Sequence, residues 1–293
     1  MVTSNSKPLD SNNETKSSRF AWIRISIIAI LMLNIGQVVG ILLSVGIALL
    51  NNEENSHYRF LSESYLPMVG VFSVLILYSF FIDKNSKKCI LSATFGGLKG
   101  NTLRLGALGY MTGVFMISAC VLVSFMHHNV LFSIGYTDAV YFIVAFVLVC
   151  IQSFSEEFLI HGYALHEYMS FYNPHTSVLL SSLLFALLHL VNAGLTVTAI
   201  ISGIMFSTLL AFICYKFDSL WGCCALHASW NYFQNIIYGI PNSGLVSGGS
   251  LFNITQSEAS LFFFDPVFGI EGTWLAISVY TCLLIALLLK KKS

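Results

Sequence analysis

The sequence predicts an all-α membrane protein: a polytopic helix bundle with about eight transmembrane helices and with the N-terminus and C-terminus in the cytoplasm. Hydrophobic residues make up 56% of the 293 residues and charged residues only 10%, whereas a soluble domain averages about 25% charged residues. Apolar runs recur along the chain at lengths near the roughly 20 residues that cross a bilayer as a helix. The basic residues are also divided unevenly between the connections. These observations favour a lipid-embedded bundle over a soluble domain.

The first predicted span follows a polar segment, residues 1–20, which we predict to be a disordered tail. The apolar run after it is too long for a signal-peptide core and lacks a persuasive cleavage site, so we expect it to be retained. Residues 21–293 are predicted to form a single membrane domain. Its predicted spans are about 21–50, 66–82, 105–126, 139–163, 177–191, 195–217, 219–238 and 273–289.

Lysine and arginine positions support this number of spans, because cytoplasmic flanks are enriched in both. With eight spans and the N-terminus inside, thirteen of the 14 basic residues fall on the cytoplasmic side. The exception is Arg59, which has three glutamates close to it in sequence. A wrong number of spans would scatter the basic residues over both sides of the membrane.

Composition also excludes several function classes. The formal net charge is zero, which gives no indication of nucleic-acid binding. The seven cysteines lie mostly in apolar runs and show no CxxC spacing, so neither a disulfide framework nor a zinc ribbon is predicted. The pairs Gly36-x-x-x-Gly40 and Gly109-x-x-x-Gly113 fit close contacts between helices.

Two adjacent carboxylates, Glu156 and Glu157, lie inside the predicted fourth span. No lysine or arginine occurs between Arg104 and Lys216, so histidines are the nearest potential cations in sequence. A charge at the centre of a membrane helix costs about 2.5–3.5 kcal/mol on insertion scales, and such residues are by default candidates for a functional site. A structural pair, hydrogen-bonded inside the bundle, is the alternative.

Polar residues spaced four apart give three of the predicted spans a polar stripe, because such residues share one face of a helix. The fourth span carries two such rows, the fifth carries one that ends in a histidine, and the seventh carries one that begins with a histidine. The rows are Gln152 with Glu156, Ser153 with Glu157 and His161, Phe185 with His189, and His227 with Asn231.

The turn near Asn173-Pro174 predicts that two of these stripes meet. An antiparallel hairpin centred there places Glu156 and His189 at equal depth, each about 16 residues or roughly 25 Å from the turn. His227 is expected to lie less deep. Carboxylates and histidines in a low-dielectric cavity suit a general base that acts on water, or a hydrolytic metal such as zinc. No H-E-x-x-H pattern occurs, so the spacing does not require a metal.

At these residues the sequence resembles the CPBP family of intramembrane proteases, which includes the type II CAAX prenyl proteases and the bacteriocin-processing and self-immunity proteins. The family motifs E-E-x-x-x-R, F-x-x-x-H and H-x-x-x-N are matched in order by EEFLIH at 156–161, FALLH at 185–189 and HASWN at 227–231. The matched core is about 139–238. The resemblance implies an endopeptidase that cuts a peptide or a membrane-anchored protein within or beside the lipid bilayer. We expect a bacterial plasma membrane.

The resemblance also implies roles for single residues. Glu156 would be the general base that activates water, and Asn231 would stabilise the oxyanion. Glu157, His189 and His227 would bind the water or a metal, either Zn²⁺ or another divalent ion. Gln152 is expected to support the site.

One departure from the family pattern falls on His161, which stands where the family has arginine. Its spacing from Glu157 lets it pair with that carboxylate, and a role that requires a charged histidine predicts a steep pH dependence. Alternatively His161 adds a ligand, or it marks an inactive member. The rival function is therefore a non-catalytic bacteriocin-immunity or membrane binding protein with a degenerate protease site.

Overall fold

The computed structural model describes residues 20–51, 56–81, 98–136 and 138–289. The predicted polar tail, residues 1–20, lies outside the described residues except for its last residue. Among the described residues, five helices are long and apolar enough to cross a membrane: Ala21–Gly46, Ser56–Phe81, Leu103–Met126, Ala139–Met169 and Val197–Phe217. Two further apolar helices, Pro174–Leu188 and Trp274–Leu289, are shorter. The all-α membrane fold is thus confirmed, whereas the number of spans and the side of the termini stay predictions.

Each predicted span contains at least one helix. Two of the helices continue into π-helical segments, η1 and η2, and a short 3₁₀ segment, η3, precedes the last helix. The elements are α2 (Ala21–Asn51), α3 (Ser56–Tyr65), α4 (Pro67–Phe81), α6 (Leu103–Met126), α7 (Ala139–Glu157), η1 (Phe158–Ala164), α8 (Leu165–Met169), α9 (Pro174–Leu188), α10 (Val197–Phe217), α11 (Leu220–Asn231), η2 (Tyr232–Ile237), η3 (Ile270–Gly272) and α12 (Trp274–Leu289).

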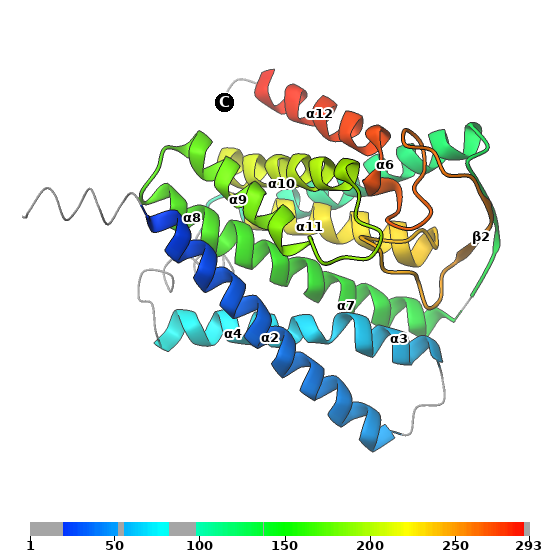
Figure 1. Ribbon diagram of the computed structural model, residues 1–293, viewed down its shortest axis with the longest axis horizontal. Coiled ribbons are helices and arrows are strands. Elements are labelled where there is room, and N and C mark those ends of the chain that lie inside the picture. The colour runs from blue at the N-terminus through cyan, green and yellow to red at the C-terminus, as the bar shows by residue number, and fades with distance from the viewer. Residues whose placement is uncertain (1–19, 52–55, 82–97, 137, 290–293) are drawn as a thin grey trace, which may run out of the picture.

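The sequence did not predict one feature, a two-stranded antiparallel ribbon. Strand β1 (Val130–Ile134) pairs with β2 (Phe252–Ser257), more than a hundred residues later. Figure 1 shows β2 at one end of the bundle, while the first residues of α2 and the last residues of α12 lie at the other end. At that second end the backbone N–H of Trp22 donates to the hydroxyl of Tyr172, and the Lys216 ammonium donates to the carbonyl of Leu287.

Side chains at the helix starts explain why the site-bearing helices begin where they do. Asp138 caps α7 by accepting from the backbone N–H groups of Val140 and Tyr141. Asn173 caps α9 and is followed by Pro174 in the first turn, a position at which proline costs no hydrogen bond. Ser219 caps α11 in the same way. The turn predicted at Asn173-Pro174 is therefore confirmed.

Glycines allow the close helix contacts that the sequence predicted. A Cβ atom on Gly113 of α6 would lie 2.4 Å from the carbonyl oxygen of Leu226 in α11, and one on Gly109 would lie 2.1 Å from the carbonyl oxygen of Gly222. A Cβ on Gly36 of α2 would lie 2.3 Å from the Cα of Val71 in α4. Backbone contact at these places fixes α11 against α6, and α11 carries part of the polar site.

Candidate active site

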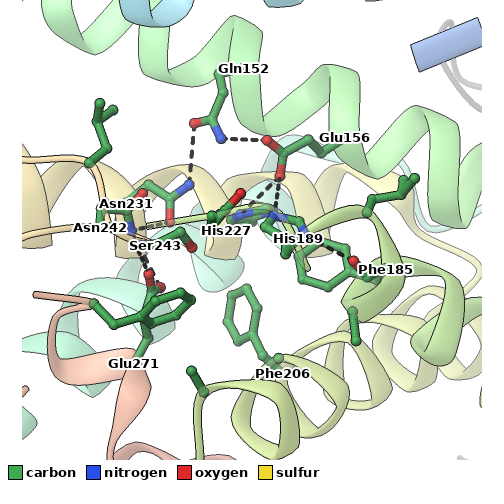
Figure 2. Close-up of a pocket in the computed structure, with 18 of the residues that line it drawn as sticks. Gln152, Glu156, Phe185, His189, Phe206, His227, Asn231, Asn242, Ser243 and Glu271 are labelled. Atoms are coloured by element: carbon green, nitrogen blue, oxygen red, sulfur yellow. Dashed lines mark hydrogen bonds and ion pairs between the residues drawn. The ribbon is translucent and has the colours of Figure 1, made fainter. Parts of the chain in front are cut away.

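Three of the four predicted rows, all except the row of Ser153, Glu157 and His161, face a cavity of about 360 Å³ inside the bundle. Side chains from α7, α9, α10 and α11 line it, together with the segment 239–273 that connects η2 to α12. Figure 2 shows these residues converging from different elements. The cavity is lined by, among others, Gln152, Glu156, Phe185, His189, Phe206, His227, Asn231, Asn242, Ser243 and Glu271.

Glu156 contributes a free carboxylate oxygen to this cavity. Its Oε1 accepts a hydrogen bond of 2.6 Å from Nε2 of Gln152. Its Oε2 is buried and has no hydrogen-bond partner within the described part of the chain. The Nε2 atoms of His189 and His227 lie 3.9 Å and 3.8 Å from this oxygen. A buried oxygen without a partner is rare and calls for an explanation, such as a bound water or ion.

The two histidines are oriented by what their Nδ1 atoms contact. Nδ1 of His189 lies 2.8 Å from the carbonyl oxygen of Phe185, one turn earlier in α9. Nδ1 of His227 lies 2.8 Å from Oε1 of Glu157. Both partners only accept, so each Nδ1 carries a proton. In the neutral form of each ring, the lone pair of Nε2 is then directed toward Glu156. Three acceptor atoms thus face one small space, which suits a donor such as water or a cation.

Glu157 lies on the other side of His227 and is completely buried. Its Oε2 is 2.5 Å from Nδ1 of His161 and its Oε1 contacts His227. The predicted i, i+4 pair with His161 is therefore present. Nε2 of His161 lies 3.3 Å from the Ser207 hydroxyl. Because a neutral ring can donate from Nδ1, this contact does not require a charged histidine, and the steep pH dependence stays a prediction.

The helix changes its winding directly after the two glutamates. Residues Phe158–Ala164 form the π-helix η1, a form that is rare and frequently found at functional sites. Within it His161 is wholly buried, and its backbone carbonyl lies 2.8 Å from Nδ1 of His166. The sequence showed only a continuous helical stripe here.

The side chains expected to bind a metal, those of Glu157, His189 and His227, do not meet at one place. Glu157 contacts the Nδ1 side of His227, whereas His189 approaches Glu156 on the Nε2 side. In the described residues, the ligand atoms of Glu157, His161 and Cys223 lie within 4.8 Å of one another. Both oxygens of Glu157 already accept hydrogen bonds, and the Cys223 thiol lies 3.1 Å from the carbonyl oxygen of Leu220. Hydrogen bonds within the protein therefore already satisfy the ligand atoms of Glu157, His161 and Cys223.

Aromatic rings hold the imidazoles in place. The ring of Phe206 meets that of His227 edge to face, with centroids 5.3 Å apart. Phe185 packs against His189 with centroids 4.4 Å apart, and reaches His227 at 6.1 Å. The phenylalanine of the F-x-x-x-H pattern thus contacts both histidines through its ring and anchors one of them through its carbonyl.

Asn231 is held from two sides. Its Nδ2 lies 3.3 Å from Oε1 of Gln152 and 3.5 Å from the Ser153 hydroxyl, so both donors make long contacts. Its Oδ1 accepts a hydrogen bond of 3.1 Å from Nδ2 of Asn242. Gln152 therefore bridges Glu156 and Asn231.

Sequence reasoning missed Asn242 and Glu271. Oε2 of Glu271 lies 3.4 Å from Nδ2 of Asn242, and its Oε1 accepts from the backbone N–H of Ser243. Burial raises the pKa of Glu271 to about 7, against the lowering effect of the Ser243 hydrogen bond. The only signal in the sequence was an acid directly before an apolar run, which is also common at membrane interfaces.

Comparison with known protein families finds a match over the helices that carry the motifs. The family model described as type II CAAX prenyl endopeptidase Rce1-like matches residues 138–233. No curated protein and no solved structure gives a significant match. The matched segment contains α7, α9, α10 and α11 and every residue of the three motifs. Over residues 138–233 the chain is therefore similar to the Rce1-like type II CAAX prenyl endopeptidases, and this match supports the CAAX protease family.

Proposed function

We propose that this protein is an intramembrane endopeptidase in which Glu156 activates water to hydrolyse a peptide bond. The observation that carries the proposal is the unpartnered Oε2 of Glu156, which faces the Nε2 atoms of His189 and His227 at 3.9 Å and 3.8 Å. This separation leaves room for a small bound group that interacts with all three atoms.

A water molecule at this place would donate one hydrogen bond to Glu156 and the other to a histidine Nε2. As its oxygen attacks the carbonyl carbon of the substrate, the proton passes to Glu156. The carbonyl oxygen then becomes an oxyanion, and Asn231 can exchange its long contacts of 3.3 Å and 3.5 Å for a hydrogen bond from Nδ2 to that oxyanion. When the C–N bond breaks, the amine takes the proton from Glu156.

The same donors fit a divalent metal ion. They comprise one carboxylate oxygen and two imidazole Nε2 atoms whose Nδ1 atoms are each fixed by a hydrogen bond, as is typical of metal ligands. In a metal-bound form Glu156, His189 and His227 would hold the ion, and Glu156 would be a ligand in place of a general base, since both oxygens of Glu157 are occupied by imidazole Nδ1 atoms. A zinc ion, when bound, supplies Lewis acidity and lowers the pKa of its water to about 7.

The substrate we propose is a peptide that carries an apolar or lipidated segment. Aromatic and aliphatic side chains line the cavity beside the polar groups, and the matching family is described as type II CAAX prenyl endopeptidases. A role in bacteriocin maturation or self-immunity, in a bacterial plasma membrane, rests on the family resemblance and remains a proposal.

The test is cleavage of an internally quenched, farnesylated CAAX peptide by the purified protein in liposomes, with mass spectrometry to locate the cut. The variants are Glu156→Gln, His189→Ala and His227→Ala, with His175→Ala as the matched control, since His175 is exposed at the start of α9. We expect each site variant to lose on the order of 10²–10⁴-fold in rate. Equal rates in all four proteins would refute the proposal and favour a binding protein.

A further inference from the structure

The wall of the cavity formed by the segment 239–273 holds a carboxylate that the reaction above does not use. Glu271 lies in η3, directly before α12. The preceding turn is tightly packed: Gly269 has φ +99°, and a Cβ atom there would lie 1.8 Å from the carbonyl oxygen of Pro241. Thr273 is buried and its hydroxyl bonds back to the carbonyl of Ile270 at 2.6 Å. The backbone therefore holds Glu271 against residues 241–243.

From Glu271 a continuous run of side-chain hydrogen bonds leads to Glu156. Nδ2 of Asn242 contacts Oε2 of Glu271 at 3.4 Å and Oδ1 of Asn231 at 3.1 Å. Nδ2 of Asn231 contacts Gln152 at 3.3 Å, and Gln152 contacts Glu156 at 2.6 Å. Figure 2 shows this run as dashed lines from one carboxylate to the other.

The direction of donation along this run decides how Asn231 is turned. A side-chain amide has one donating and one accepting end, and an ionised carboxylate only accepts. The backbone N–H of Ser243 donates to Glu271, and Asn242 presents its Nδ2 to the same carboxylate. That Nδ2 also faces Asn231, so the atom of Asn231 that accepts from it must be Oδ1. A turned-over Asn231 would set two NH₂ groups against each other, so its own Nδ2 points toward Gln152 and the Glu156 side of the cavity.

We propose that Glu271, acting through Asn242, is a positioning residue that keeps the Nδ2 donor of Asn231 directed toward the reacting carbonyl group. The inference rests on the proposed function only in giving Asn231 an oxyanion to bind. The orientation of the amide itself follows from the contacts around Glu271, which lie 40 residues beyond Asn231 in sequence and outside the segment that matches the family.

Two substitutions test the direction of donation along these hydrogen bonds, and each keeps the size of the side chain nearly unchanged. Glu271→Gln removes the charge, and Asn242→Asp replaces the donor that faces Asn231 with an acceptor that attracts its Nδ2. At pH 8 we expect each variant to lower kcat at least tenfold and to leave KM within about twofold, because a misdirected oxyanion donor forfeits part of the 10²–10³-fold that such a donor supplies. Glu258→Gln is the matched control, since Glu258 is exposed in the same segment.

A double-mutant cycle separates positioning from general damage. In an Asn231→Ala background, Glu271→Gln should cause no further loss of kcat, because the residue it orients is gone. An equal loss in both backgrounds would overturn the inference. Thermal unfolding of each variant shows whether the fold has been kept.

A second readout does not depend on activity. In protein labelled with ¹⁵N at asparagine side chains, the Asn231 amide signal is assigned by its disappearance in Asn231→Asp. We expect Glu271→Gln to shift this signal and Glu258→Gln to leave it in place; an unmoved signal in Glu271→Gln would overturn the inference. If the wild type cleaves no peptide faster than Glu156→Gln does, the proposed function fails, and the amide signal still decides whether Glu271 orients Asn231.

Discussion

Replacing His161 with alanine tests whether Glu157 supports the site as a buried, fully paired carboxylate. Both of its oxygens accept from imidazole Nδ1 atoms, at 2.5 Å from His161 and 2.8 Å from His227, and the side chains of Glu157 and His161 are 0% exposed. His161→Ala leaves Oε2 of Glu157 without its partner in a place that water does not reach. Leaving a buried charge without one of its partners costs about 3–5 kcal/mol.

For a chain of this size a loss of 1 kcal/mol lowers Tm by about 2–4 °C, so we expect Tm of His161→Ala to fall by roughly 10 °C. The measurement is thermal unfolding in one detergent, monitored by circular dichroism. His175→Ala, the exposed control, should melt with the wild type. His161→Gln keeps a donor and should recover much of the loss. If His161→Ala melts together with His175→Ala, Glu157 is not held as described.

Three further outcomes are expected. Gly113→Leu should lower both Tm and peptidase activity, because its Cβ would lie 2.4 Å from a carbonyl oxygen of α11, whereas Gly106→Leu on the same helix, where a Cβ meets nothing within 4 Å, should not. The folded-state pKa of Glu271, about 7, lies above its ordinary 4.5, so the folded chain keeps a proton that the unfolded chain loses. The free energy of unfolding should therefore fall between pH 5 and pH 8, by at most about 3 kcal/mol. In denaturant unfolding, Glu271→Gln should abolish this fall. Metal analysis should find one divalent ion per chain that is lost in His189→Ala, and full activity of metal-free wild type would refute metal assistance.

The meeting of α7 and α9 could be predicted because local signals fixed it. Asn173-Pro174 marks the turn, and counting residues from the turn places Glu156 and His189 level, as the 3.9 Å distance confirms. The count was less accurate for His227, which was expected to lie less deep but approaches Glu156 equally closely, at 3.8 Å. Such counting assumes straight helices that start from a common plane, and it cannot represent the crossing of α11 over α6.

Other features were beyond the reach of local patterns. The segment 239–273 has no periodicity, so nothing in its sequence indicated that Asn242 and Glu271 would contact Asn231. The pairing of β1 with β2 joins two short runs more than a hundred residues apart. The π-helix η1 follows α7 directly, with no proline at the change of winding. Contacts of this kind depend on the whole fold and become visible only in three dimensions.

The different surroundings of Glu156 and Glu157 could also be seen only in the structure. They bear on position 161, where this chain has histidine and the family pattern has arginine. Adjacent residues on a helix point about 100° apart, so only one carboxylate can border the cavity and keep a free oxygen. Glu156 does so, while Glu157 points into the bundle and orients His227. Two imidazole Nδ1–H groups, from His161 and His227, donate to the two oxygens of this inward carboxylate. We therefore propose that His161 supports Glu157 in place of the arginine of the family pattern, with the Ser207 hydroxyl 3.3 Å from its Nε2.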